Sequence, residues 1–85
     1  HYTIKVGRSN RECDLVVNKD TIISRVHLLI AYERDLGKFV VTDKSSNGVF
    51  LEGGIRLQKD KSTLLDAGTV MYLADMANAI KVSLQ

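Results

Sequence analysis

The chain has 85 residues, of which 45% are apolar, the composition of one small folded domain rather than of a disordered segment. Twelve basic and ten acidic residues leave a net charge of +2, too little to attract nucleic acid or a membrane surface through the field alone. No apolar run approaches the roughly 20 residues that span a bilayer. We therefore expect residues 1–85 to form a single domain of a longer protein, without a nucleic-acid or membrane partner. The one cysteine, Cys13, cannot form an internal disulfide, which favours a reducing, cytoplasmic compartment.

Short apolar segments separated by polar loops run through the whole chain. Residues 2–6 alternate apolar and polar side chains with the period of a half-buried strand, and residues 26–33 predict a longer strand after a turn-rich segment. Further strands are predicted at residues 15–17, 38–42, 49–51, 55–57, 63–65, 69–73 and 79–84. Many short strands, no convincing amphipathic helix and no proline predict an all-β sandwich or barrel.

Two further predictions concern how the strands are connected and paired, and one concerns an ambiguous segment. Gly53-Gly54 indicates a two-residue hairpin turn between its flanking strands. Residues 69–73 fit helical spacing as well as a strand, and we assign a strand because their neighbours are strands. The first and last strands could pair, which would bring the termini together.

Donors suited to an anion recur in three polar loops, namely Gly7-Arg8, Ser24-Arg25-Val26-His27 and Ser46-Asn47-Gly48. The guanidinium groups of Arg8 and Arg25 can bind phosphate oxygens with two parallel hydrogen bonds. Ser24 and Ser46 add hydroxyl donors. The amide of Asn47 both donates and accepts, which suits the backbone of an extended peptide. These loops therefore predict an anion site without a metal or cofactor.

In order and spacing the three loops resemble the forkhead-associated (FHA) domain, whose pattern is Gly-Arg, then Ser-Arg-x-His, then Asp-x-x-Ser-x-Asn-Gly or a close variant of it. Here the third motif is Asp43-Lys44-Ser45-Ser46-Asn47-Gly48, and the matched segment covers residues 6 to about 73. The resemblance implies an FHA/SMAD-like two-sheet β-sandwich of about eleven short, mostly antiparallel strands. It also implies a non-enzymatic, monomeric signalling module whose loops at one end bind phosphothreonine-containing proteins.

Carried over by position, the resemblance assigns a role to each matched residue. Arg8 and Ser24 would contact the phosphate, with Ser46 helping, while Arg25 would lie beside the phosphopeptide. Asn47 would hydrogen-bond the peptide main chain. The remaining three would support the architecture of the site: Gly7, His27 and Gly48. The charge of a phosphothreonine, about −1.5 to −2, can be matched by two arginines and two hydroxyls without a metal.

Three positions depart from residues that are frequent in this family. Val49 and Thr69 stand where Thr and Asp are common, and we expect both changes to be tolerated. Glu52 stands where Asn is common, and its carboxylate could change peptide specificity or disfavour acidic ligands.

Other interpretations remain open from the sequence. The domain could be a protein-interaction module of the same fold that ignores phosphate. Ser24, His27 and Asp43 have the residue types of a hydrolase triad, although residues three apart on a strand face opposite sides. Nucleic-acid binding is a further alternative, but the sequence contains no basic stripe and no set of aromatic residues for base stacking that would support it. The side chain of Arg25 could instead pair with Asp20 or with Asp43.

Overall fold

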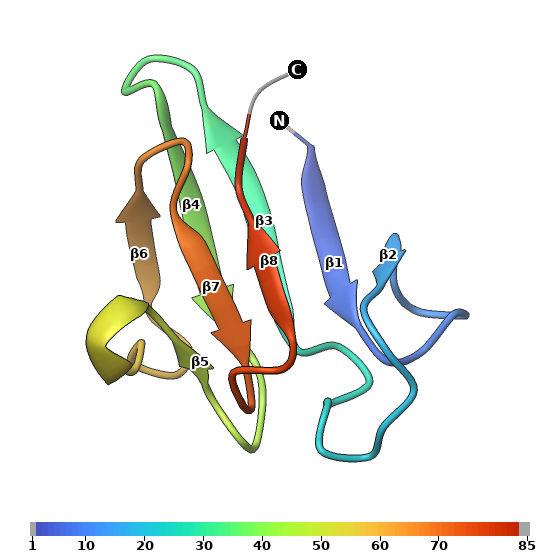
Figure 1. Cartoon of the computed structure of the whole chain (residues 1–85). Coiled ribbons are helices and arrows are strands. Elements are labelled where there is room, and N and C mark those ends of the chain that lie inside the picture. The colour runs from blue at the N-terminus through green and yellow to red at the C-terminus, as the bar shows by residue number, and fades with distance from the viewer. Residues whose placement is uncertain (1, 84–85) are drawn as a thin grey trace.

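The computed structural model describes residues 2–83, which fold into two β-sheets (Figure 1). Its strands are β1 (Thr3–Gly7), β2 (Leu15–Val16), β3 (Leu28–Glu33), β4 (Lys38–Asp43), β5 (Val49–Phe50), β6 (Ser62–Leu65), β7 (Val70–Leu73) and β8 (Ala79–Lys81). One sheet has the order β2-β1-β3-β4-β6 and the other β5-β7-β8. Every pair is antiparallel except β1 with β2. The predicted all-β, two-sheet, mostly antiparallel sandwich is confirmed.

The strand count is lower than the resemblance implied. The described residues contain eight strands, whereas about eleven were expected. One predicted strand, at residues 55–57, is reduced to a single isolated bridge between Phe50 and Arg56. The long strand predicted at residues 26–33 begins only at Leu28, because the preceding residues belong to the loop. One predicted strand is thus missing and another is shorter, while the two-sheet arrangement is as predicted.

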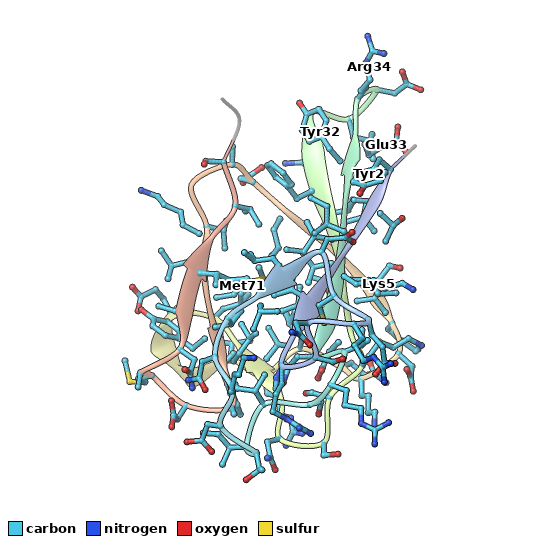
Figure 2. All side chains as sticks on the ribbon, turned by 90° about the vertical axis from the view of Figure 1, so that its right-hand side faces the viewer. Tyr2, Lys5, Tyr32, Glu33, Arg34 and Met71 are labelled. Atoms are coloured by element: carbon cyan, nitrogen blue, oxygen red, sulfur yellow. The ribbon has the colours of Figure 1, made fainter. Side chains whose placement is uncertain are left out.

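Apolar side chains from the facing sheets fill the space between them. In β4 the side chains alternate, so that Phe39 and Val41 point inward and are buried. Met71 of β7 is fully buried against them and lies between the two layers in Figure 2. The inward series of β4 ends at Asp43, so at one end of the core a carboxylate takes the place of an apolar side chain.

Two predicted connections are wrong. Gly53-Gly54 does not form a two-residue hairpin turn, because Glu52 joins the glycines in a 3₁₀ turn, η1 (Glu52–Gly54). This turn is closed by a hydrogen bond from Leu51 N to Ile55 O at 2.7 Å. The first and last strands do not pair either, because β1 bonds β2 and β3 while β8 bonds β7 in the other sheet. The end of the last predicted strand, at Leu84, lies outside the described residues.

Four loops gather at one end of the sandwich, the lower end in Figure 1. They connect β1 to β2, β2 to β3, β4 to β5 and β7 to β8. The β3–β4 turn, with Arg34, lies at the opposite end (Figure 2). The topology therefore brings the three motif-bearing loops to the same end of the molecule.

Candidate functional site

A buried histidine joins two of the motif-bearing loops. The ring of His27 is fully buried. Its Nδ1 accepts a hydrogen bond from Ser24 N at 3.0 Å, and its Nε2 lies 2.8 Å from Gly48 O. Since Nδ1 is an acceptor and a carbonyl can only accept, the ring is the neutral tautomer with its proton on Nε2. Burial lowers the pKa of His27, while the Gly48 carbonyl and the Asp43 charge act in the opposite direction.

A second buried polar group shapes the β4–β5 loop. Asp43 and Ser45 are both fully buried. Asp43 Oδ1 accepts hydrogen bonds from Ser45 N at 2.8 Å and from Ser45 Oγ at 2.6 Å. Ser45 Oγ in turn accepts from Gly48 N at 2.8 Å. Gly48 thus has both backbone polar groups satisfied by buried side chains, which fixes the turn that carries Ser46 and Asn47.

Close backbone packing joins the first loop to the second. Arg8 N donates to Ser24 O at 3.0 Å and to Arg25 O at 3.1 Å. A Cβ atom on Gly7 would lie only 2.4 Å from Arg25 O, closer than such atoms can approach. Only glycine at position 7 therefore allows these two loops to touch.

The predicted phosphate donors form one connected group. Arg8 Nε donates to Ile23 O at 2.8 Å, which directs the guanidinium along the second loop. Its terminal nitrogens bind no other residue in the described chain. Ser24 Oγ accepts from Ser46 N at 3.1 Å, so its own proton remains available to donate. Arg8 N is also bonded to Ser24 O, so Arg8, Ser24 and Ser46 are neighbours that each keep side-chain donors unused by the protein.

Asn47 and Arg25 lie beside this group. Asn47 Nδ2 donates to Ile22 O at 2.9 Å, which joins the second and third loops and leaves the amide oxygen and one N–H for a ligand. The side chain of Arg25 is exposed and pairs with neither Asp20 nor Asp43, nor with any other residue between 2 and 83. The structure brings all five predicted binding residues to one end, while their contacts with a ligand stay predictions.

Three further residues support the loops and were not singled out from the sequence. Ser45 is indistinguishable from Ser46 by residue type, although an Asp two residues before a Ser is a local pattern that favours such side-chain-to-backbone bonds. Asn18 and Asn78 are hydrogen-bonded across the β2–β3 and β7–β8 loops, a contact between residues 60 positions apart that no local pattern indicates.

The triad geometry is absent from the described site. Both ring nitrogens of His27 bind backbone groups, and Ser24 Oγ is bonded to Ser46 N rather than to the imidazole. The bonded oxygen of Asp43 faces Ser45. Ser24, His27 and Asp43 therefore do not form the relay of hydrogen bonds that activates a serine nucleophile.

The three departures from the family's frequent residues occupy different places. Val49 is fully buried in β5 opposite Leu73. Thr69 Oγ1 donates to Asp66 O at 2.7 Å within the β6–β7 turn. The carboxylate of Glu52 accepts a hydrogen bond from Tyr72 OH at 3.2 Å. The first two are structural, and Glu52 is held on the β5–β7 side of the molecule.

Residues 2–83 contain no group of three or more His, Cys, Asp and Glu side chains arranged to hold a metal ion. Over the same residues no helix is long and apolar enough to cross a bilayer. Cys13 is a free thiol whose Sγ lies 2.8 Å from Arg25 O, and burial raises its pKa.

The family model of the FHA domain matches residues 4–74. The chain belongs to the FHA domain family. The meiosis-specific serine/threonine-protein kinase MEK1 of Saccharomyces cerevisiae is 37% identical over 78 residues, which cover 87% of this chain and 15% of the kinase. A nibrin homolog of Oryza sativa subsp. indica is 38% identical over 88 residues, which cover 82% of this chain and 15% of that protein. This FHA domain thus spans only a small part of the curated relatives it matches.

Solved FHA domains share the fold. The crystal structure of the MEK1 FHA domain has a TM-score of 0.83 at 32% identity, covering 100% of this chain and 72% of that one. The MEK1 FHA domain in complex with a HOP1 phosphothreonine peptide has a TM-score of 0.78 at 32% identity, covering 100% and 83%. The N-terminal FHA domain of Rad53p from S. cerevisiae, in complex with a phosphothreonine peptide, has a TM-score of 0.76 at 24% identity, covering 92% and 62%, which supports the fold alone.

Proposed function

We propose that this FHA domain recognises phosphothreonine-containing protein segments and catalyses no reaction. The observation that carries the proposal is that Arg8, Ser24 and Ser46 are linked directly, by the hydrogen bonds from Arg8 N to Ser24 O and from Ser46 N to Ser24 Oγ, while each keeps side-chain donors unused. It is supported by the MEK1 FHA domain, 32% identical, which was crystallised with a phosphothreonine peptide.

In this proposal each residue binds the ligand through side-chain donors or acceptors that make no hydrogen bond within the protein. The terminal nitrogens of Arg8 and the hydroxyl protons of Ser24 and Ser46 bind the phosphate, and the Arg25 guanidinium lies beside it as a second positive charge. The free amide groups of Asn47 bind the peptide backbone. No cofactor or metal takes part, because charge-assisted hydrogen bonds to guanidinium and hydroxyl donors satisfy a phosphate dianion.

We infer three further properties of the whole protein. Residues 1–85 form a single monomeric domain, which serves as one module of a longer protein, as the matching region does in the curated relatives. The free thiol of Cys13 favours a reducing, cytoplasmic compartment. The host protein would use the domain to associate with the products of a threonine kinase.

A calorimetric titration tests the proposal with two peptides that differ only in the phosphate. We expect binding of the phosphothreonine peptide and none of its unphosphorylated twin. Arg8→Ala should weaken binding at least tenfold, because a hydrogen bond to a charged group contributes about 1.5–3 kcal/mol. Arg34→Ala, at the opposite end of the sandwich, is the matched control and should bind as the parent does.

Two results would contradict the proposal. Equal binding of both peptides would favour the phosphate-independent interaction module. Turnover of an ester substrate that disappears with Ser24→Ala would favour the hydrolase instead.

A further inference from the structure

An arginine outside the three motifs is fixed against the binding loops. Arg56 follows the 3₁₀ turn and bridges to Phe50 of β5. Its guanidinium carbon lies 5.6 Å from the centroid of the Phe50 ring, a cation–π contact. Its Nε would lie 2.8 Å from a Cβ atom built on Gly48, so the side chain packs directly against the Gly48 backbone. The aromatic ring and the glycine together hold this guanidinium in one place.

The charge of Arg56 has no acidic partner among the described residues. The two acids four positions away in sequence are both otherwise engaged. Glu52 accepts a hydrogen bond from Tyr72 OH, and Asp60 pairs with Lys44 at 2.9 Å. Arg56 is also solvent-exposed, so its terminal donors are open to a ligand. An ordered but unpaired guanidinium at a binding loop suits the recognition of an anion.

The distance to the phosphate donors is short on the scale of a peptide. Each Cα-to-Cα step spans about 3.8 Å, so Gly48 lies at most about 7.6 Å from Ser46. The contact between Arg56 and Gly48 then places the guanidinium within about 12 Å of Ser46. An extended peptide advances about 3.4 Å per residue, so this distance corresponds to about four residues.

We propose that Arg56 binds an aspartate or glutamate side chain of the bound peptide, within about four residues of the phosphothreonine, and so sets sequence specificity. The inference rests on the proposed function and adds to it a second, carboxylate-binding position on the Gly48 side of the site. Gly48 is the point of contact between the two positions, because it follows Asn47 in the loop and touches Arg56.

A set of nine phosphothreonine peptides tests this position. One peptide has alanine at the four residues on each side of the phosphothreonine, and each of the others replaces a single alanine by aspartate. Dissociation constants are measured for the parent, Arg56→Gln and Arg56→Lys at low ionic strength, where ion pairs are least screened. Arg34→Gln is the control for the loss of one positive charge far from the loops.

We expect the parent to prefer aspartate over alanine at one position by about fivefold, the upper range for a partly exposed ion pair. Arg56→Gln should lose this preference while binding the all-alanine peptide within about twofold of the parent, which also shows that the variant is folded. Arg56→Lys should keep part of the preference because it keeps the charge. Arg34→Gln should keep all of it.

Two results overturn the inference and leave the proposed function standing. One is a parent that binds the phosphothreonine peptides with no preference for aspartate at any position. The other is an Arg56→Gln variant that retains the parent's preference. A parent that binds none of the phosphothreonine peptides would overturn the inference and the proposed function together.

Discussion

Two sets of polar side chains occupy the loop end of the sandwich, one beneath the other. The inner set, His27, Asp43 and Ser45, is fully buried, and its hydrogen bonds go to the protein's own loops. The outer set is partly or fully exposed and keeps donors unused: Arg8, Ser24, Arg25, Ser46 and Asn47. We therefore propose that folding depends mainly on the inner set and binding mainly on the outer set, although both come from the same short motifs.

Burial explains why the two sets differ in energetic role. A buried polar group that loses its partner destabilises a protein by about 1–3 kcal/mol, whereas an exposed group can bind water instead. Substitutions in the inner set should therefore lower the free energy of unfolding and disturb binding only through the loops. Substitutions in the outer set should mainly weaken binding, and those of Arg25 and Ser46, whose side chains bind no other described residue, should leave the free energy of unfolding nearly unchanged.

The largest effect is expected for His27→Ala. It removes a fully buried ring, leaves Ser24 N without its partner and leaves Gly48 O with Ala74 N as its remaining donor, so we expect the free energy of unfolding to fall by about 3 kcal/mol. Urea unfolding followed by circular dichroism measures this change. A loss below about 1 kcal/mol would mean that His27 does not join the loops in solution.

The neighbouring serines of the β4–β5 loop offer a matched pair. Ser45→Ala removes the acceptor of Gly48 N and a donor to Asp43, and should cost about 2 kcal/mol of stability. Ser46→Ala changes the same residue type one position later but on an exposed side chain, and should change stability by less than about 0.5 kcal/mol. Titration calorimetry with a phosphothreonine peptide should show the opposite ranking of the two variants. Where the loop keeps its structure, Ser46→Ala should lose more affinity than Ser45→Ala. Equal stability losses would contradict the division into two sets.

The two-sheet arrangement is well predicted from the sequence, because strand propensity and the alternation of apolar and polar side chains indicate where strands lie and which of their faces is buried. The strand predicted at residues 38–42 differs from β4 by one residue, since its aromatic and β-branched side chains, Phe39 to Thr42, favour a strand. Strand ends are less well predicted. Val26 and His27 continue the apolar run before β3, yet His27 turns into the loop, where its ring meets two backbone partners from distant sequence.

The site was predictable in its residue types and not in its geometry. The motifs select Arg8, Ser24 and Asn47, but two adjacent serines look alike in sequence. Only the inward direction of β4, which ends at Asp43, distinguishes Ser45 from Ser46. The position of Arg56 was not predictable for a related reason. Its contact with Gly48 depends on the shape of the 3₁₀ turn, which the Gly53-Gly54 pattern predicted incorrectly.

A smaller effect is expected when the pH is lowered, because the buried His27 then makes the free energy of unfolding depend on pH. Burial lowers the pKa of His27 below its ordinary value near 6.5, so below pH 6.5 the unfolded chain takes up a proton that the folded chain does not. Stability is thus fully present above pH 6.5 and falls as the pH drops toward the folded pKa, by at most about 1.4 kcal/mol per pH unit. Urea unfolding at a series of pH values from about 7.5 to about 5.5, on either side of the ordinary histidine pKa, measures how steeply the free energy of unfolding changes with pH.

The carboxylates of the chain also titrate toward acid pH, so the control is a variant without the imidazole. His27→Gln keeps a donor and an acceptor in the side chain, and its stability should depend less on pH over the same range. If the parent and His27→Gln have the same slope, the imidazole is not held neutral by the fold.

The smallest effect on stability is expected for Arg25→Ala. Its side chain is exposed and binds no residue between 2 and 83, so the free energy of unfolding should change by less than about 0.5 kcal/mol. The backbone carbonyl of Arg25, which holds the first loop through Arg8 N and Ser9 N, is unaffected by the substitution. Affinity for a phosphothreonine peptide should nevertheless fall about fivefold, because one positive charge beside the phosphate is lost. A variant that binds normally but unfolds more easily would place Arg25 in the inner set and reverse its assignment.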